Sequence, residues 1–220
     1  MRGAPALLLA VAGLATACAG VAGPARVPDP LSAEEHNDLG LAYYTRGEAA
    51  LAAREFGRAV ELRPGFTRAR VNLGDARLLL GDVPGAIRAY EAARDQRPGD
   101  PAIANNLAWA LLQDERRWPE AEPLIRAALA QAPEPRGYYL DTLGVLLLRQ
   151  DAPGEALAVL RAALDDAALR DPRARALVLA HTAQALARLG DPAGATRCDR
   201  AARALLGSGA GEVGASDTVC

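Results

Sequence analysis

Apolar side chains recur at helical spacing along most of this chain. Within residues 33–66, Leu39 and Tyr43 lie four positions apart, and a second stripe is formed by Ala52, Phe56 and Ala59. Residues four apart share a face of an α-helix, so this segment is predicted to form two helices that each bury one stripe. The pattern returns thirty-four residues later at Leu73, Gly74, Ala86, Tyr90 and Ala93. A fixed period of this length indicates a stacked array of helical hairpins.

The repeated pattern is specific enough to suggest a family. Leu39-Gly40-x-x-Tyr43, followed by Ala52-x-x-x-Phe56-x-x-Ala59 and Pro64, resembles the tetratricopeptide repeat, a helix-turn-helix unit. The resemblance implies an all-α fold, a right-handed α-solenoid of about five repeats. Its copies cover residues 33–66, 67–100, 101–136 and 137–170, and residues 171–206 form a degenerate fifth copy or a pair of capping helices.

Several positions predict local departures from a regular array. One inserted residue near Asp114 to Trp118 is expected to lengthen the turn between the two helices of the third copy. Ala168 stands where the fourth copy should end in Pro, so its second helix is expected to run on. In the fifth copy, the polar residues Thr182 and Asp199 suit an end cap, whose outer face no further repeat covers.

Small residues and prolines agree with this helical reading. Gly40 and Gly74 are expected to let the two helices of a repeat touch where a larger side chain would hold them apart. Pro84, Pro153 and Pro192 fall at the starts of second helices, where a missing N–H group is harmless.

The resemblance also implies which residues line the concave face of the array, because first-helix positions line it in this family. Carried over by alignment, the groove positions are Asn37, Asp38, Leu41, Tyr44, Arg68, Asn72, Asp75, Leu79, Asn105, Asn106, Trp109, Gln113, Tyr138, Asp141 and Arg149. Chaperone-binding members carry Lys and Arg where this chain has Asn37, Ala102 and Asn106, so a receptor for chaperone tails is not expected.

Two kinds of groove residue leave alternatives open. The carboxamides of Asn72 and Asn106 offer both donors and acceptors, which suits binding of an extended peptide backbone. They equally suit hydrogen bonds between adjacent helices. Trp109 either anchors a ligand in the groove or fills space between helices.

The first residues resemble an export signal. Residues 1–17 combine Arg2, an apolar run and Ala15-Thr16-Ala17 directly before Cys18. Two fates compete: lipidation of Cys18 as in a bacterial lipoprotein, or ordinary cleavage that releases a soluble periplasmic product. Lipidation would leave Cys198 and Cys220 as a candidate disulfide pair. Residues 18–32 then form the anchor and a Pro-rich tether, and residues 207–220 a disordered tail.

Composition narrows the function classes. The net charge is −2, all basic residues are Arg, and aromatics make up 4%, so nucleic acid is not an expected partner. The chain has no Lys, and its only histidines, His36 and His181, lie far apart in the sequence. No metal-ligand spacing, cofactor motif or supported catalytic triad is found, so an enzyme is not expected.

These expectations converge on an exported, outer-membrane-anchored or periplasmic adaptor that binds a peptide segment of another envelope protein. The chain resembles tetratricopeptide lipoproteins that help assemble outer-membrane machines such as type IV pili. A scaffold that recruits peptidoglycan or polysaccharide enzymes is the alternative, and an enzyme is the remote one.

Overall fold

The computed structural model describes residues 29–131 and 136–207. The chain divides into two compact units after residue 30. In the described part of the second unit the chain forms ten α-helices and one 3₁₀-helix, and no strand. The helices are α1 Ala33–Thr45, α2 Ala49–Leu62, α3 Thr67–Leu79, α4 Val83–Gln96, α5 Pro101–Leu112, α6 Ala121–Gln131, α7 Gly137–Arg149, α8 Pro153–Asp165, α9 Pro172–Arg188 and α10 Pro192–Gly207. The all-α prediction is confirmed.

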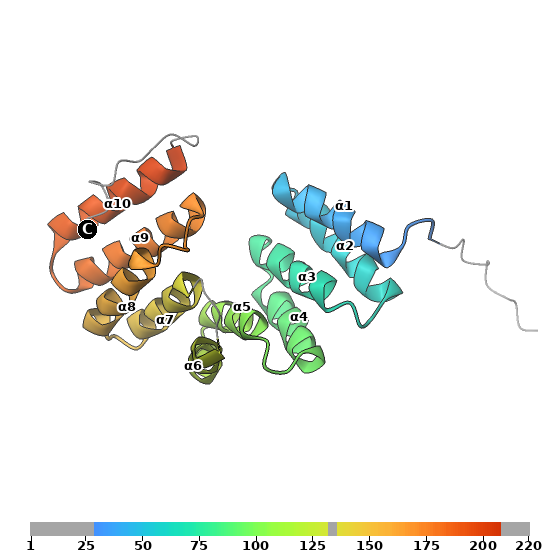
Figure 1. Cartoon of the computed structure of the whole chain (residues 1–220), viewed down its shortest axis with the longest axis horizontal. Coiled ribbons are helices and arrows are strands. Elements are labelled where there is room, and N and C mark those ends of the chain that lie inside the picture. Colours follow the sequence, from blue (N-terminus) through green and yellow to red (C-terminus); the bar gives the residue numbers. More distant parts are fainter. Residues whose placement is uncertain (1–28, 132–135, 208–220) are drawn as a thin grey trace, which may run out of the picture. The chain divides into compact units, whose positions relative to one another are not determined.

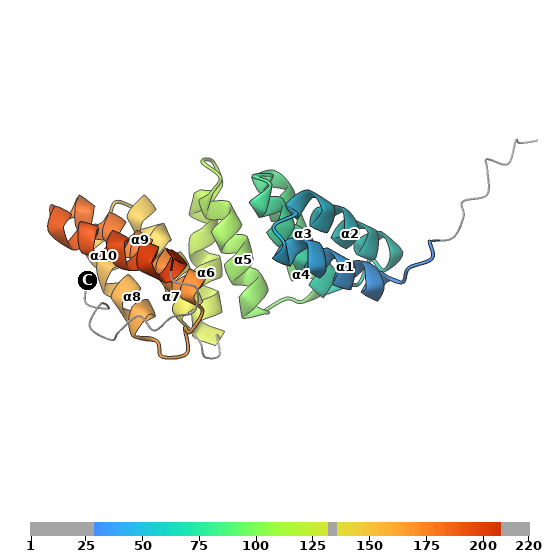
Figure 2. The same cartoon turned by 90° about the horizontal axis from the view of Figure 1, so that it is seen from above.

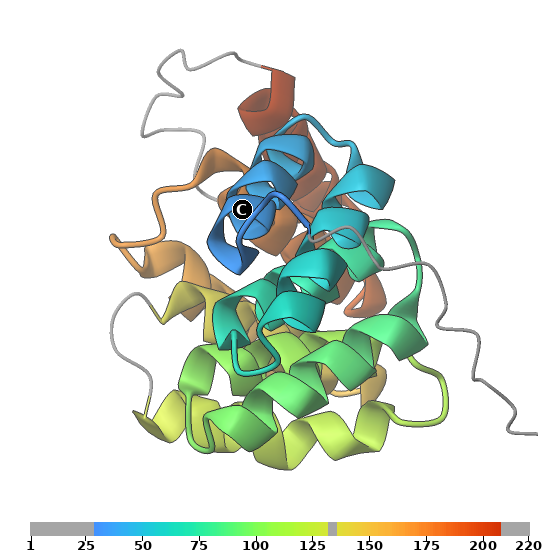
Figure 3. The same cartoon turned by 90° about the vertical axis from the view of Figure 1, so that its right-hand side faces the viewer.

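Each helix packs against the next one along the chain, from α1 on α2 to α9 on α10 (Figure 1; other views in Figures 2 and 3). The first helices of successive pairs also touch one another, since α1 contacts α3, α5 contacts α7, and α7 contacts α9. The five hairpins therefore form a stack in which α1 lies beside α3, and α7 lies beside both α5 and α9.

Side chains and proline set the helix starts. Ser32 caps α1 in a capping box: its hydroxyl accepts from the Glu35 backbone N at 3.2 Å, and the Glu35 carboxylate accepts from the Ser32 backbone N at 2.7 Å. The carboxylates of Asp82 and Asp191 accept from backbone N–H groups of α4 and α10, both at the third residue of the helix. Such caps satisfy N–H groups that have no partner inside the helix.

The predicted close approach of the paired helices is confirmed at the helix glycines. A Cβ atom added to Gly40 would lie 2.6 Å from the Phe56 ring, and one added to Gly74 would lie 2.5 Å from the Tyr90 ring. Gly144 stands in the same relation to Leu160, at 2.5 Å. A glycine on the first helix thus accommodates the large residue of the second.

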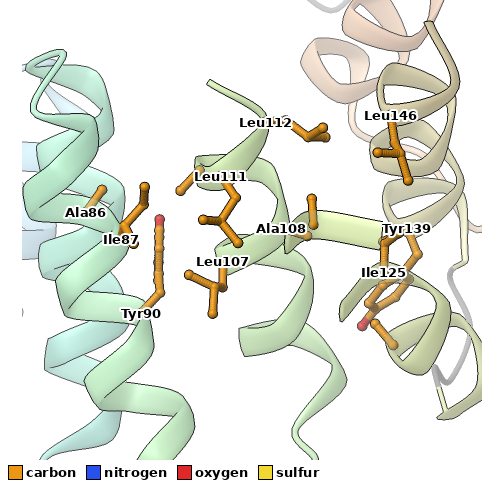
Figure 4. Close-up of a cluster of buried hydrophobic side chains, with 13 residues drawn as sticks. Ala86, Ile87, Tyr90, Leu107, Ala108, Leu111, Leu112, Ile125, Tyr139 and Leu146 are labelled. Atoms are coloured by element: carbon orange, nitrogen blue, oxygen red, sulfur yellow. The ribbon is translucent and has the colours of Figure 1, made fainter. Parts of the chain in front are cut away.

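The largest core cluster spans the second to fourth repeats (Figure 4). Ile87 and Tyr90 of α4 face Leu107 and Leu111 of α5, and all four side chains are buried. Further along, Ile125 of α6 continues the same cluster. Because this core is shared between neighbouring repeats, no single repeat can bury its apolar surface alone.

The insertion in the third repeat lengthens the turn, as predicted. A 3₁₀-helix at Trp118–Glu120 follows a loop in which Asp114 accepts from the backbone N of Arg116 at 2.8 Å and of Arg117 at 3.0 Å. Arg117 then binds Glu91 of α4 at 2.8 Å. The extra residue is therefore held by its own hydrogen bonds and tied to the previous repeat.

The expectation that the second helix of the fourth repeat runs on is wrong. The helix α8 ends at Asp165, and the next residue, Asp166, has an extended backbone. The Asp166 carboxylate accepts from the backbone N of Gly137 at 2.7 Å and of Ala168 at 2.9 Å. These bonds lower the pKa of Asp166, that from Ala168 most strongly. An aspartate that satisfies loop N–H groups ends the helix here without proline.

Candidate functional site

The predicted groove residues lie on the odd-numbered helices, but to very different depths. Those with exposed side chains are Asp38, Leu41, Arg68, Leu79, Gln113, Tyr138 and Arg149. The half-buried ones are Tyr44, Asn72, Asp75, Asn105, Asn106 and Trp109. Asn37 and Asp141 are buried. These two need correction as ligand-binding positions, because neighbouring repeats cover them.

Asn37 takes part in a hydrogen bond between the first two repeats. Its side-chain oxygen accepts a hydrogen bond at 2.9 Å from the Asn72 amide, and it joins α1 to α3 in this way. Asn37 is 0% exposed. For these two amides the structure therefore favours a hydrogen bond between adjacent helices, whereas Asn106 has no side-chain hydrogen bond among the described residues.

One pocket lies where the first two repeats meet, and we call it the α1–α3 pocket. Its lining comprises Leu41, Tyr44, Phe56, Asn72 and Asp75. Four of these five are predicted groove residues, brought together from α1 and α3, and Phe56 of α2 is the fifth. The pocket volume is about 60 Å³, enough for a few water molecules or the end of one side chain.

Asp75 gives the α1–α3 pocket its electrostatic character. The Tyr90 hydroxyl of α4 donates to Asp75 Oδ1 at 2.5 Å. Burial raises the pKa of Asp75, and the Tyr90 hydrogen bond only partly offsets this effect. Burial, and then the charge of Asp75, raise the pKa of Tyr44. The pocket therefore contains a carboxylate whose charge is poorly solvated.

A second cluster joins three first helices. His181 Nδ1 of α9 lies 2.7 Å from Asp141 Oδ1 of α7, and the His181 ring lies against Trp109 of α5, with ring centroids 5.9 Å apart. Side chains of α5 and α9 can meet over α7 only if the odd-numbered helices line the concave side of the stack. Trp109 thus makes a contact within the fold besides being partly exposed.

The sequence reasoning missed His181 as a member of this cluster. The alignment of groove positions stopped at the fourth repeat, because the pattern decays in the fifth. The groove positions recur at a fixed spacing in the first helices. Continuing that spacing into α9 was the signal in the sequence that could have found His181.

A buried contact between His36 and Glu55 in the first repeat was also missed. His36 Nδ1 of α1 lies 2.7 Å from Glu55 Oε2 of α2, and Arg54 donates to the other Glu55 oxygen at 2.8 Å. Burial acts to raise the pKa of Glu55, but the hydrogen bonds from Arg54 and His36 outweigh it and lower the pKa. This pair lies inside a helical hairpin and away from the α1–α3 pocket.

Several predicted features fall outside the described residues. These are the export signal at residues 1–17, Cys18 with most of the tether, Cys220 and nearly all of the tail. Cys198 is fully buried in α10 and takes part in a disulfide. Its pairing with Cys220 stays a prediction.

The described residues contain neither a candidate metal-binding group nor a candidate membrane-spanning helix. Between residues 29 and 131 and between 136 and 207, no group of three or more His, Cys, Asp or Glu side chains could hold a metal ion. Within the same ranges, no helix has the length and apolar character to cross a membrane.

Comparison with known proteins identifies the repeat. The tetratricopeptide repeat model matches residues 37–101, 75–135 and 105–168. The "TPR repeat-containing protein PA4299" of Pseudomonas aeruginosa is 38% identical over 93 residues, which cover 42% of this chain and 37% of that protein. The chain thus matches well under half of that relative's length.

Two solved structures show the same fold. The chain described as "APC/C hetero-tetramer Cut9-Hcn1" has a TM-score of 0.71 at 19% identity, covering 79% of this chain and 34% of that one. "PilW, widely conserved type IV pilus biogenesis factor" has a TM-score of 0.67 at 19% identity, covering 84% of this chain and 80% of that one. The periodic sequence, the stacked hairpins and the model match agree, and the chain belongs to the tetratricopeptide repeat family.

Proposed function

We propose that this protein is an adaptor of the bacterial cell envelope that binds an extended segment of a partner protein on its concave face. The α1–α3 pocket carries the proposal, because it joins groove residues of two repeats around one recess of about 60 Å³. The exposed Leu79, one helical turn after Asp75 on α3, adds apolar contact surface on the same helix.

The comparisons support this class of function. Tetratricopeptide repeat proteins generally serve as non-catalytic scaffolds for other proteins. One structural neighbour is described within a hetero-tetramer and another as a type IV pilus biogenesis factor. Together with the export-signal pattern before Cys18, the second neighbour favours a role in assembling an envelope machine such as a pilus.

Site-specific photo-crosslinking tests the binding face. A photoreactive phenylalanine analogue would replace Leu41 of α1 in one variant and Leu62 of α2 in another, in cells that produce the full chain. The two leucines are similarly exposed, at 39% and 42%, so Leu62 is a matched control on a second helix. We expect a covalent adduct with one envelope protein from position 41 and little from position 62. Equal adducts from both positions would contradict a concave binding face.

Anchoring requires a separate test. We propose that Cys18 carries a lipid that holds the protein at the outer membrane, facing the periplasm. Cys18→Ala should then move the protein from the membrane fraction to the soluble periplasmic fraction. Unchanged fractionation would contradict the anchor and favour ordinary signal cleavage, while the crosslinking result would stand.

A further inference from the structure

Asp75 in the α1–α3 pocket is a half-buried carboxylate without a cationic partner. Its one hydrogen bond among the described side chains comes from the neutral Tyr90 hydroxyl, at 2.5 Å. In the part of the chain that the structure describes, no Arg or His lies within ion-pair distance of it, and the chain contains no Lys.

A second groove aspartate provides the comparison. Asp141 is buried in α7, and His181 lies 2.7 Å from it. The fold therefore supplies a hydrogen-bonding imidazole for one concave-face aspartate, and neither Arg nor His for the other among the described residues. A poorly solvated charge without a partner is costly, so such groups are commonly paired or mark a functional site.

The walls of the pocket suit the end of a long basic side chain. Leu41 and the rings of Tyr44 and Phe56 offer apolar contact to an aliphatic stem. The Asn72 and Asp75 side chains supply polar atoms in the same recess, where a charged head group would end. A volume of about 60 Å³ admits such an end group and excludes a whole folded element.

We propose that the α1–α3 pocket binds the cationic end of a Lys or Arg side chain in the partner segment, with Asp75 as the paired carboxylate. This specificity rests on the proposed function of the concave face. The exposed Asp38 of α1 does not line the pocket, whose negative charge comes from Asp75 of α3. The pocket therefore favours basic segments and rejects acidic ones, because like charges across an interface are unfavourable.

Selection from a displayed library of random twelve-residue peptides tests this specificity without a known partner. The full chain is the bait, as the wild type, as Asp75→Asn and as Asp38→Asn. Asparagine preserves the shape of Asp75 and an acceptor for Tyr90, and Asp38→Asn removes an exposed charge from the same face. We expect Lys or Arg to be enriched at least about fivefold at one peptide position with the wild type and with Asp38→Asn. With Asp75→Asn, that enrichment should disappear.

Calorimetry then measures the pairing directly. The best peptide selected by the wild type is compared with versions in which the enriched residue is exchanged for Lys, Arg or uncharged norleucine. We expect norleucine to weaken binding by about tenfold or more, and Asp75→Asn to weaken the basic peptide similarly. The two changes together should weaken binding little more than either alone, because they remove the same pair. If Asp75→Asn lowers the melting temperature strongly, the binding of the norleucine peptide to the wild-type protein decides the test by itself.

The outcomes separate this inference from the proposed function. Selected binders without a preference for Lys or Arg would overturn the cationic pocket and leave the concave binding face intact. If no peptide is enriched over the starting library, the peptide-binding function fails, and the pocket specificity fails with it.

Discussion

The Asn72 amide donates a hydrogen bond at 2.9 Å to the fully buried side-chain oxygen of Asn37, one repeat earlier in the chain. The bond joins α1 to α3 on the concave side. Of the two uses that the sequence left open for Asn72, the structure shows the hydrogen bond between adjacent helices.

Loss of this bond should destabilise the N-terminal repeats. We expect Asn37→Ala to lower the free energy of unfolding by about 1–3 kcal/mol, because it creates a cavity and removes a buried partner. A double-mutant cycle with Asn72→Ala should give a coupling of about 0.5–1.5 kcal/mol in urea denaturation. Asn106→Ala, at the position equivalent to Asn72 but without this bond, should cost less than about 0.5 kcal/mol. Strictly additive effects of Asn37→Ala and Asn72→Ala would show that the pair is not coupled.

The close helix contact at Gly74 predicts strong intolerance of even a methyl group. A Cβ there would lie 2.5 Å from the Tyr90 ring, which is buried and cannot move freely. We expect Gly74→Ala to cost about 1–3 kcal/mol from overpacking. At Gly57 of α2, an added Cβ meets nothing within 4 Å, so Gly57→Ala should gain about 0.5–1 kcal/mol through helix propensity. Thermal melts of both variants would check the opposite signs, and a neutral Gly74→Ala would contradict the contact.

The turn between α7 and α8 contains a residue whose replacement by glycine should stabilise the protein. Asp151 has φ 57°, in the left-handed region, where the corresponding turns use Gly47, Gly81 and Gly190. Asp151→Gly should therefore raise the free energy of unfolding by about 0.5–1 kcal/mol. The reverse change, Gly47→Asp, should lower it by a similar amount. The expectation fails if both substitutions shift the melting temperature in the same direction.

The raised pKa of Asp75 predicts a specific pH dependence of stability. Unfolded aspartate titrates near about 3.9, and burial moves the folded pKa of Asp75 above that value. Between the two pKa values the folded state binds more protons, so ionisation of Asp75 destabilises the fold as pH rises through this window. The facing ionisable groups are the phenols of Tyr44 on α1 and Tyr90 on α4, which both stay neutral there.

The difference between Asp75→Asn and wild type isolates this effect. Carboxylates with lowered pKa values, such as Asp114 and Glu120, stabilise the fold more as pH rises. They do so in both proteins, so their contribution cancels in the difference. We expect the advantage of Asp75→Asn in free energy of unfolding to grow as pH rises and to level off above the folded pKa of Asp75. Urea denaturation between about pH 4 and 7 would measure it, and a constant difference would contradict the raised pKa.

The sequence by itself determined the helical hairpins and their internal packing. The thirty-four-residue spacing from Leu39 to Leu73 defined the repeat. Gly40 and Gly74 predicted a close approach of the paired helices, which the structure shows against Phe56 and Tyr90. These features are local: helix periodicity and turn residues act within one repeat, so their pattern can be read directly.

Only the tertiary structure decided how deeply each concave position lies and which residues it meets. Alignment placed Asn37, Asp75 and Asp141 on one face without distinguishing a buried amide, a carboxylate in a pocket and a carboxylate beside His181. The alignment could not predict the ring contact between Trp109 of α5 and His181 of α9. Depth and partner depend on the angle between successive repeats, which is set by the packing of whole helices and has no counterpart in a short sequence pattern.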